Sequence, residues 1–321
     1  MTDNSTENQD LMSRQLDNLE KTADLERSRH RWGILFKSLG ALYLVFVTVG
    51  VGLAYLGKMP PDSGHVAVVR LNGPIAENES AGAGKVNAGL RAAFEEDAAK
   101  AVFIAINSPG GSPVQSSYIY QEIRRLKALH DKPVYAVISD IGASGAYYVA
   151  AAADEIFANE SSLVGSIGVT AAGFGFTGLI EKIGVERRQF TSGEHKTFLD
   201  PFAPVKEDEA EFWSGVLGQV HQNFIDAVEQ GRGSRLQKTP DLYSGLIWNG
   251  TQAKELGLID GFGSVRSVSR EKLGIEEFWD YTYKDPFSKL SGILGTSLEQ
   301  GLARALSADR EGTGLSMTWA Q

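Results

Sequence analysis

Residues 101–112 have the sequence AVFIAINSPGGS, in which an apolar run leads directly into a glycine-rich turn. The run Ala101–Ile106 predicts a buried strand, and Asn107–Ser112 predicts a tight turn after it. Helical periodicity follows from Pro113 to His130, and the apolar run Pro133–Ser139 predicts the next strand. Because strands alternate with helices in this way, we expect an α/β fold.

A serine flanked by small residues lies further along the chain. Ser144 belongs to the segment 142–148, GASGAYY, and Lys196 to the segment 192–196, SGEHK. A neutral lysine can accept the proton of a serine nucleophile, as in the serine-lysine variants of the catalytic triad. Backbone N–H groups of the turn 107–112 can bind the oxyanion that such an attack creates. The serine, the lysine and the glycine turn together predict a serine protease.

These segments resemble the signal peptide peptidase A family, in its short, single-domain bacterial form. The resemblance runs from about His65 to about Gly263, and it covers neither the first 60 residues nor about the last 40. It is carried by SPGG at 108–111, GASGAYY at 142–148, GSIGV at 165–169, SGEHK at 192–196 and GTQAKELGLID at 250–260. The combination is specific, although the SPGG turn alone also occurs in the related Clp protease and crotonase folds. The resemblance implies the Clp/crotonase-like ββα superhelix, which periodicity alone does not distinguish from a doubly wound sheet.

The resemblance also implies roles for individual residues. Ser144 would be the nucleophile, Lys196 the base, and Ser166 the residue that orients the lysine amine, while the N–H groups of Gly111 and Gly145 would form the oxyanion hole. It further implies a homo-oligomer whose active sites are shared between subunits. The residues alone leave other readings open, namely a solvated surface lysine, a turn serine and two ordinary glycine turns.

A lysine base must be neutral, which sets a requirement on its surroundings. Lowering its pKa from about 10.4 to about 7–8 disfavours the charged form by about 4 kcal/mol, and burial can supply this. Phe190, Phe198 and Phe202 surround Lys196 in the sequence and predict an apolar pocket. His195 is the alternative base for a Ser-His-Asp triad, but the family position is that of Lys196, so we interpret His195 as a pocket or surface residue.

Composition excludes several other classes of protein. The 321 residues carry a net charge of −9, which makes nucleic acid an improbable partner. There is no cysteine, so disulfides, thiolate metal sites and a cysteine nucleophile are excluded. No metal-ligand spacing and no nucleotide-binding loop are present, and we expect no cofactor.

The N-terminal region predicts a membrane anchor. Residues 38–57 carry no charge and are long enough, as a helix, to cross the roughly 30 Å hydrocarbon core of a bilayer. A buried core helix and a cleavable signal peptide are the alternatives. The basic collar before this stretch predicts a cytoplasmic N-terminus and an extracytoplasmic catalytic domain on the bacterial inner membrane. The expected organisation is a polar tail and collar (1–37), the transmembrane helix (38–57), a linker (58–64), the protease domain (65–285), and an amphipathic helix and tail (286–321).

The leading interpretation is a membrane-anchored serine endopeptidase that cleaves remnant signal peptides or other apolar peptides. Alternatives are a quality-control protease for membrane proteins, an inactive membrane scaffold and a crotonase-type acyl-CoA enzyme. The remaining local predictions are strands at 65–71, 155–158, 166–170 and 185–191, helices at 86–99, 143–153, 178–182 and 206–230, and disorder at 231–234.

Overall fold

The computed structural model describes residue 21, residues 30–49 and residues 60–284. The chain divides into two compact units, Met1–Pro60 and Pro61–Gln321. The predicted C-terminal amphipathic helix, at 286–306, lies outside the described residues.

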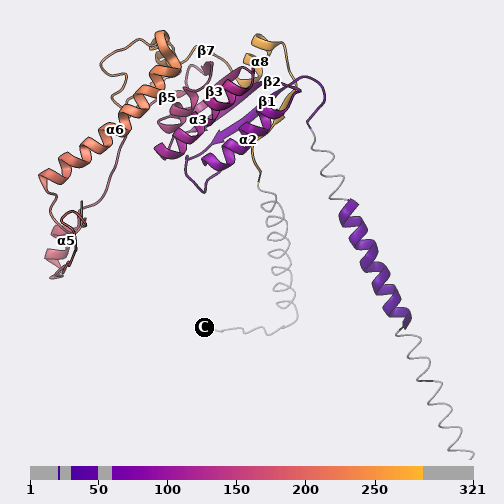
Figure 1. Cartoon of the computed structure of the whole chain (residues 1–321), viewed down its shortest axis with the longest axis horizontal. Coiled ribbons are helices and arrows are strands. Elements are labelled where there is room, and N and C mark those ends of the chain that lie inside the picture. The colour runs from indigo at the N-terminus through magenta and orange to yellow at the C-terminus, as the bar shows by residue number, and fades with distance from the viewer. Residues whose placement is uncertain (1–20, 22–29, 50–59, 285–321) are drawn as a thin grey trace, which may run out of the picture. The chain divides into compact units, whose positions relative to one another are not determined.

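The second unit is built on a mixed sheet (Figure 1). Its described strands are β1 (His65–Asn72), β2 (Ala99–Ser108), β3 (Val134–Ala143), β4 (Glu155–Ala158), β5 (Leu163–Gly165), β6 (Ile247–Asn249), β7 (Gly261–Phe262) and β8 (Phe278–Asp280). The order is β6-β5-β3-β2-β1-β8, and β4 pairs with both β3 and β7. Among these strands only the pair β5–β6 is antiparallel. The prediction of an α/β fold is therefore confirmed.

Helices connect the strands and cover the sheet. They are α2 (Ala83–Glu95), α3 (Pro113–Leu129), α4 (Gly145–Ala150), α5 (Thr177–Lys182), α6 (Glu207–Arg232), α7 (Gly250–Glu255) and α8 (Val265–Leu273), with a short 3-10 turn at Gly233–Arg235. The two faces of the sheet pack against different helices, as strand β1 illustrates. Val69 and Leu71 belong to the core that contains the buried residues of α2, α3 and α4, whereas Val66 and Val68 pack with Val268 of α8. Burial on both faces explains the nearly continuous apolar runs that predicted β1 and β2.

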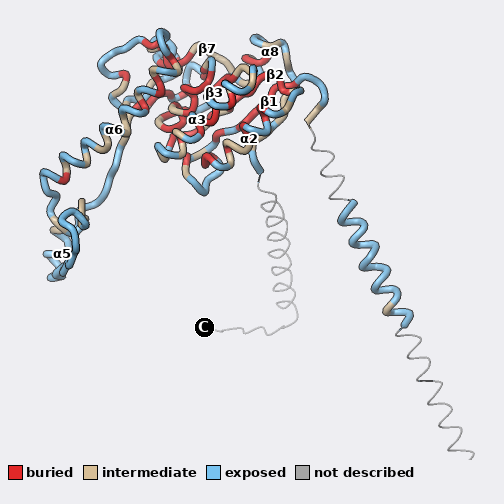
Figure 2. The backbone as a smooth tube through the Cα atoms, in the orientation of Figure 1, coloured by how far each residue is buried: buried red, intermediate tan, exposed pale blue. Residues whose placement is uncertain are grey.

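Helix α6 has two unlike halves. It spans Glu207–Arg232, which corresponds to about 39 Å at about 1.5 Å per residue. The buried residues of its C-terminal half, Phe224, Ala227 and Val228, pack in the main core. Its N-terminal half and the segment around α5 are mostly exposed, as the pale blue tube in Figure 2 shows.

Several local predictions are wrong near the end of β3. The strand continues to Ala143, so the helix predicted at 143–153 is reduced to α4, Gly145–Ala150. The strand predicted at 166–170 is absent, because β5 ends at Gly165 and Ser166 has a positive φ of 51°. No strand forms at 185–191, where the described backbone is irregular.

The disorder predicted at 231–234 is also wrong. The side chain of Arg232 is buried and binds both carboxylate oxygens of Asp260, at 2.7 and 3.0 Å. It also donates to the carbonyl of Gly257 at 2.9 Å. Asp260 is distant from Arg232 in the sequence. The composition of the Gly-Arg-Gly-Ser segment alone therefore predicts disorder, although this ion pair orders it.

In the described part of the first unit, one helix, His30–Val49, is long and apolar enough to cross a membrane. The predicted transmembrane helix, 38–57, overlaps it from residue 38 to residue 49, and residues 50–57 lie outside the described part of the chain. An apolar N-terminal helix is therefore present, and it begins earlier than the uncharged stretch.

Candidate active site

Ser144 occupies a strained turn between β3 and α4. Its φ and ψ are 54° and −127°, a conformation that is unfavourable for a residue with a side chain and costs about 1–3 kcal/mol. Two backbone hydrogen bonds hold it there: the Ser144 N–H donates to Gly165 O at 2.8 Å, and the Tyr148 N–H donates to Ser144 O at 3.0 Å. The residue itself is half-buried. A serine is therefore presented at the tip of a fixed strand-to-helix turn.

The helix after Ser144 is anchored by its first tyrosine. The Tyr147 hydroxyl donates to the carbonyl of Leu258 at 2.7 Å, and its ring is fully buried. Burial raises the pKa of the Tyr147 phenol, so this group remains a neutral donor. The anchor fixes α4, and with it the direction of the Ser144 turn.

The glycine turn 108–111 packs directly against this serine. A Cβ at Gly110 would lie 2.6 Å from the backbone nitrogen of Gly145 and 2.7 Å from the Cβ of Ser144, and the φ of Gly110 is 94°. Only glycine allows this approach and this backbone conformation. The turn is held from outside by Ile75, whose N–H donates to Gly110 O and whose carbonyl accepts from Ser112 N–H, both at 2.8 Å.

Two backbone donors remain free beside Ser144. Neither the Gly111 N–H nor the Gly145 N–H donates a hydrogen bond within the described residues. Gly145 is the first residue of α4, where a helix leaves its N–H groups without an intrahelical partner. The two groups are close, because a Cβ on Gly145 would lie 3.3 Å from the Gly111 nitrogen. These two N–H groups can donate hydrogen bonds to a developing oxyanion.

Ser166 directly follows the neighbouring strand, β5. Ala143 and Gly165 are paired in the parallel β3–β5 ladder, so Ser144 and Ser166 follow paired positions on strands about 4.8 Å apart. The Ser166 N–H donates to Leu246 O at 2.7 Å. The structure thus brings Ser144, Ser166, Gly111 and Gly145 together.

Lys196 is not part of this cluster within one chain. It is exposed and belongs to residues 172–206, which we call the arm. The arm is tied to the start of α6, where Leu199 N–H donates to the Glu209 carboxylate at 3.0 Å. Phe224 of the same helix packs against Tyr148 of α4, with ring centroids 5.0 Å apart. The helix between Glu209 and Phe224 is about 22 Å long at about 1.5 Å per residue, so α6 separates the base of the arm from the Ser144 turn.

The apolar pocket predicted around Lys196 does not form as expected. Phe190 is 92% exposed, and Phe202 pairs with Phe176 at a centroid distance of 5.5 Å. Phe198 packs against Phe212, at 5.7 Å, rather than around the lysine. His195 and Phe198 line a small pocket of about 410 Å³ together with Asp208, Glu209 and Phe212. The interpretation of His195 as a pocket or surface residue is consistent with this position.

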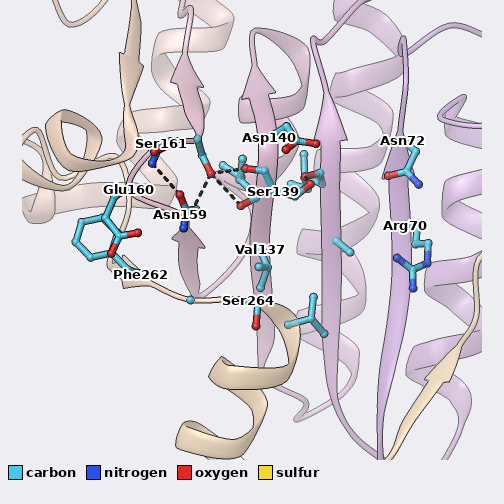
Figure 3. Close-up of a pocket in the computed structure, with 16 residues that line it drawn as sticks. Arg70, Asn72, Val137, Ser139, Asp140, Asn159, Glu160, Ser161, Phe262 and Ser264 are labelled. Atoms are coloured by element: carbon cyan, nitrogen blue, oxygen red, sulfur yellow. Dashed lines mark hydrogen bonds between the residues drawn. The ribbon is translucent and has the colours of Figure 1, made fainter.

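A larger pocket, of about 700 Å³, lies on the sheet face that carries α8 (Figure 3). Arg70, Asn72, Ser139 and Ser264 are among its lining residues, and none of the predicted site residues lines it. Because it holds neither the serine nor the free N–H groups, we do not assign the reaction to it. In the described part of the chain no cluster of three or more His, Cys, Asp or Glu side chains has the geometry to hold a metal ion.

Sequence reasoning missed the residues that support the site. Ile75 and Leu246 act through backbone groups, and His221 of α6 lies within hydrogen-bond distance of the turn after Ser166. Any residue type can supply a backbone partner, so no local signal marks Ile75 or Leu246. For His221 the only signal is a polar residue three positions before Phe224, on the face of α6 that packs on the core.

A serine on a strained strand-to-helix turn, beside two free backbone N–H groups, is the arrangement typical of a serine hydrolase. Residues 127–273 match the family described as Peptidase family S49, which supports an SppA-family protease. The match confirms the resemblance to signal peptide peptidase A and the Clp-like class of the fold.

Individual relatives agree with this assignment. A putative signal peptide peptidase SppA of Enterococcus faecium is 35% identical over 228 residues, which cover 69% of this chain and 65% of that protein. The chloroplastic serine protease SPPA of Arabidopsis thaliana is 34% identical over 65% of this chain and 31% of its own length. A protein of Brucella abortus named Na(+)/H(+) antiporter NhaA is 51% identical over 58% of this chain, but only 25% of that protein is matched. The chain thus spans less than two thirds of the length of these relatives.

Proposed function

We propose that this protein is a membrane-anchored serine endopeptidase that uses Ser144 to cleave apolar peptides, with remnant signal peptides as the main substrate class. The observation that carries the proposal is the Ser144 turn with the free N–H groups of Gly111 and Gly145 beside it. The intact turn argues against an inactive scaffold. The SppA names of two relatives favour signal peptides as substrates.

The proposed mechanism follows from these positions. Neutral Lys196 accepts the Ser144 Oγ–H proton as Oγ bonds to the carbonyl carbon of the substrate, and the Gly111 and Gly145 N–H groups bind the resulting oxyanion. When the C–N bond breaks, the ammonium of Lys196 returns the proton to the leaving nitrogen. Water then attacks the acyl-serine ester through the same proton transfers, which releases the acid and regenerates Ser144. Ser166 orients the lysine amine by accepting one of its hydrogen bonds.

The base comes from a second copy of the chain. Support comes from the length of α6 between the arm and the Ser144 turn, and from the exposure of Lys196 in the single chain. The arm also carries large exposed apolar side chains, including Phe174 at 81% and Phe190 at 92%. Contact with a neighbouring subunit would bury this surface and remove water from Lys196, which favours its neutral form. The active site would therefore be shared within a homo-oligomer.

The membrane topology is proposed from charge. The apolar helix His30–Val49 follows Arg27 and Arg29 and is itself preceded by a polar tail, which favours a cytoplasmic N-terminus and an extracytoplasmic domain in the inner membrane of a bacterium. A reporter fused after residue 70 should be active outside the cytoplasm, and one fused at residue 25 inside it. The reverse pattern would contradict this orientation.

The central test uses the full-length protein in detergent. A fluorophosphonate probe should label wild-type protein at Ser144, and apolar peptides should be hydrolysed. Ser144→Ala should lose both activities while keeping its melting temperature, and Ser161→Ala, an exposed serine in a neighbouring loop, serves as the matched control. Hydrolysis that persists in Ser144→Ala would eliminate this mechanism, and a folded wild type that neither labels nor cleaves would favour a scaffold. Preference for misfolded membrane proteins over signal peptides would instead favour a quality-control protease.

A further inference from the structure

His221 connects α6 to the turn that carries Ser166. Its Nε2 atom lies 3.1 Å from the carbonyl oxygen of Ile167. A carbonyl only accepts hydrogen bonds, so Nε2 must carry the hydrogen. The imidazole donates from this atom whether it is neutral or protonated. This hydrogen bond therefore connects α6 to the residue after Ser166 in both protonation states of His221.

The turn 165–168 needs such links because its backbone is strained. Gly165 and Ser166 both have positive φ, at 103° and 51°. The Ser166 N–H is held by Leu246 O, and the side chain of Ile167 is fully buried in the main core. Strained conformations persist only where the surrounding contacts determine them. His221 supplies the contact on the C-terminal side of Ser166.

We propose that His221 is a positioning residue that holds the Ile167 carbonyl and thereby sets the direction of Ser166 beside Ser144. This inference rests on the proposed function, in which Ser166 orients the lysine amine. His221 does not touch the reacting atoms, and it acts through Ser166. Nothing in the family motifs quoted above includes it, because it lies in α6, between the SGEHK segment and the GTQAKELGLID segment.

Packing alone does not account for this residue. The packing contact of this face of α6 is made by Phe224, whose ring lies against Tyr148. His221 is only half-buried, so the burial of its ring contributes less than that of Phe224. Its distinguishing feature is the donor at Nε2. Substitutions of similar size that keep or remove this donor can therefore separate the role in packing from the role in hydrogen bonding.

The test compares His221→Gln, His221→Met and the control Gln222→Met in the full-length protein. The Gln side chain places an amide N–H donor near the position of Nε2, whereas Met fills similar space without a donor. Gln222 is exposed, and among the described residues its amide donates to Asp226 at 2.8 Å, so its replacement probes general damage to α6. We expect His221→Met to lower kcat about tenfold or more with little change in KM, because a small misplacement of an orienting group acts on the chemical step. His221→Gln should stay within about threefold of wild type, and Gln222→Met should match wild type.

A second measurement does not depend on activity. Amide hydrogen exchange in residues 165–168 should accelerate in His221→Met and remain near wild type in His221→Gln. Equal kcat and equal exchange in His221→Met and Gln222→Met would overturn the proposal, as would equal losses in the Met and Gln variants. If wild-type protein shows no hydrolysis dependent on Ser144, the proposed function fails. The exchange measurement then still decides whether His221 holds the turn.

Discussion

The proposed sharing of the active site between subunits can be tested by mixing two inactive variants. Ser144→Ala lacks the nucleophile and Lys196→Ala lacks the proposed base. Along α6 the base of the arm and the Phe224 contact with the Ser144 helix are about 22 Å apart, at about 1.5 Å per residue. A lysine that acts on Ser144 must come within about 3 Å of its Oγ. In the single chain the hydrogen bond between Leu199 and Glu209 ties the arm to the start of α6, at the far end of this distance from the Ser144 helix.

The expected yield follows from random assembly. In a ring of equal numbers of the two variants, a site is active only where a subunit with intact Ser144 meets a neighbour with intact Lys196. This occurs at about one quarter of the interfaces, so about one quarter of wild-type activity should return. Within-chain dyads would give no activity, because no single chain in the mixture carries both residues.

A matched mixture provides the control. Wild type mixed equally with the double variant should also give about one quarter of full activity if sites are shared, but about one half if each chain is self-sufficient. The two variants are refolded together with different affinity tags, hetero-oligomers are isolated through both tags, and peptide hydrolysis is measured per protein. Activity near zero in verified hetero-oligomers of the first mixture, with about one half in the second, would refute the shared site.

Three further outcomes are expected from single substitutions. Gly110→Ala should remove fluorophosphonate labelling with a smaller effect on expression, since its Cβ would fall 2.6 Å from the Gly145 nitrogen at a φ of 94°; normal labelling would contradict this contact. Arg232→Met should lower the free energy of unfolding by about 3–5 kcal/mol in denaturant titrations, because it leaves a partly buried carboxylate without its main partner; a loss below about 1 kcal/mol would contradict it. Hydrogen bonding to Arg125 lowers the pKa of Glu122 from 4.5 to about 2, against burial, which raises it, and with further help from Arg91. This depressed pKa adds stability that is complete above about 4.5 and is lost as the pH falls towards about 2, so Glu122→Gln should flatten the acid limb of a melting-temperature profile; an unchanged limb would contradict it.

The sequence predicted those parts of the fold whose signals are local. Apolar runs marked β1, β2 and β3, because strands buried on both faces have nearly continuous apolar sequence. The glycine turn at 108–111 and the GASGAYY segment predicted the positions of the Gly111 and Gly145 N–H donors and of Ser144. These are features in which the residue type itself, glycine or a small side chain, is required by the backbone.

Long-range contacts account for most of the errors. The Ser166–Thr170 segment alternates apolar and polar residues like a strand, but β5 ends at Gly165 and Ser166 has a positive φ, with its N–H bonded to Leu246, a distant residue. The composition of residues 231–234 predicts disorder, but the ion pair between Arg232 and Asp260 orders this segment in the structure. The apolar surroundings expected for Lys196 were inferred from neighbours in sequence, but in the single chain Phe198 and Phe202 pack elsewhere and Phe190 is exposed.

The strained backbone positions lie at or near the residues of the proposed catalytic site. In the described part of the chain, the non-glycine residues with positive φ are Ser144, Ser166 and Leu199. The first two lie side by side at the ends of β3 and β5, and the third follows Lys196 by three positions. Its N–H is fixed by the carboxylate of Glu209, whose pKa is lowered by that bond and by Lys206. Strain of this kind costs about 1–3 kcal/mol at each position, persists only where the surrounding contacts determine it, and is concentrated at active sites. Under the proposed sharing of the active site, the conformation at Leu199, held by its bond to Glu209, would fix the backbone from which Lys196 extends towards a neighbouring subunit's Ser144 and Ser166.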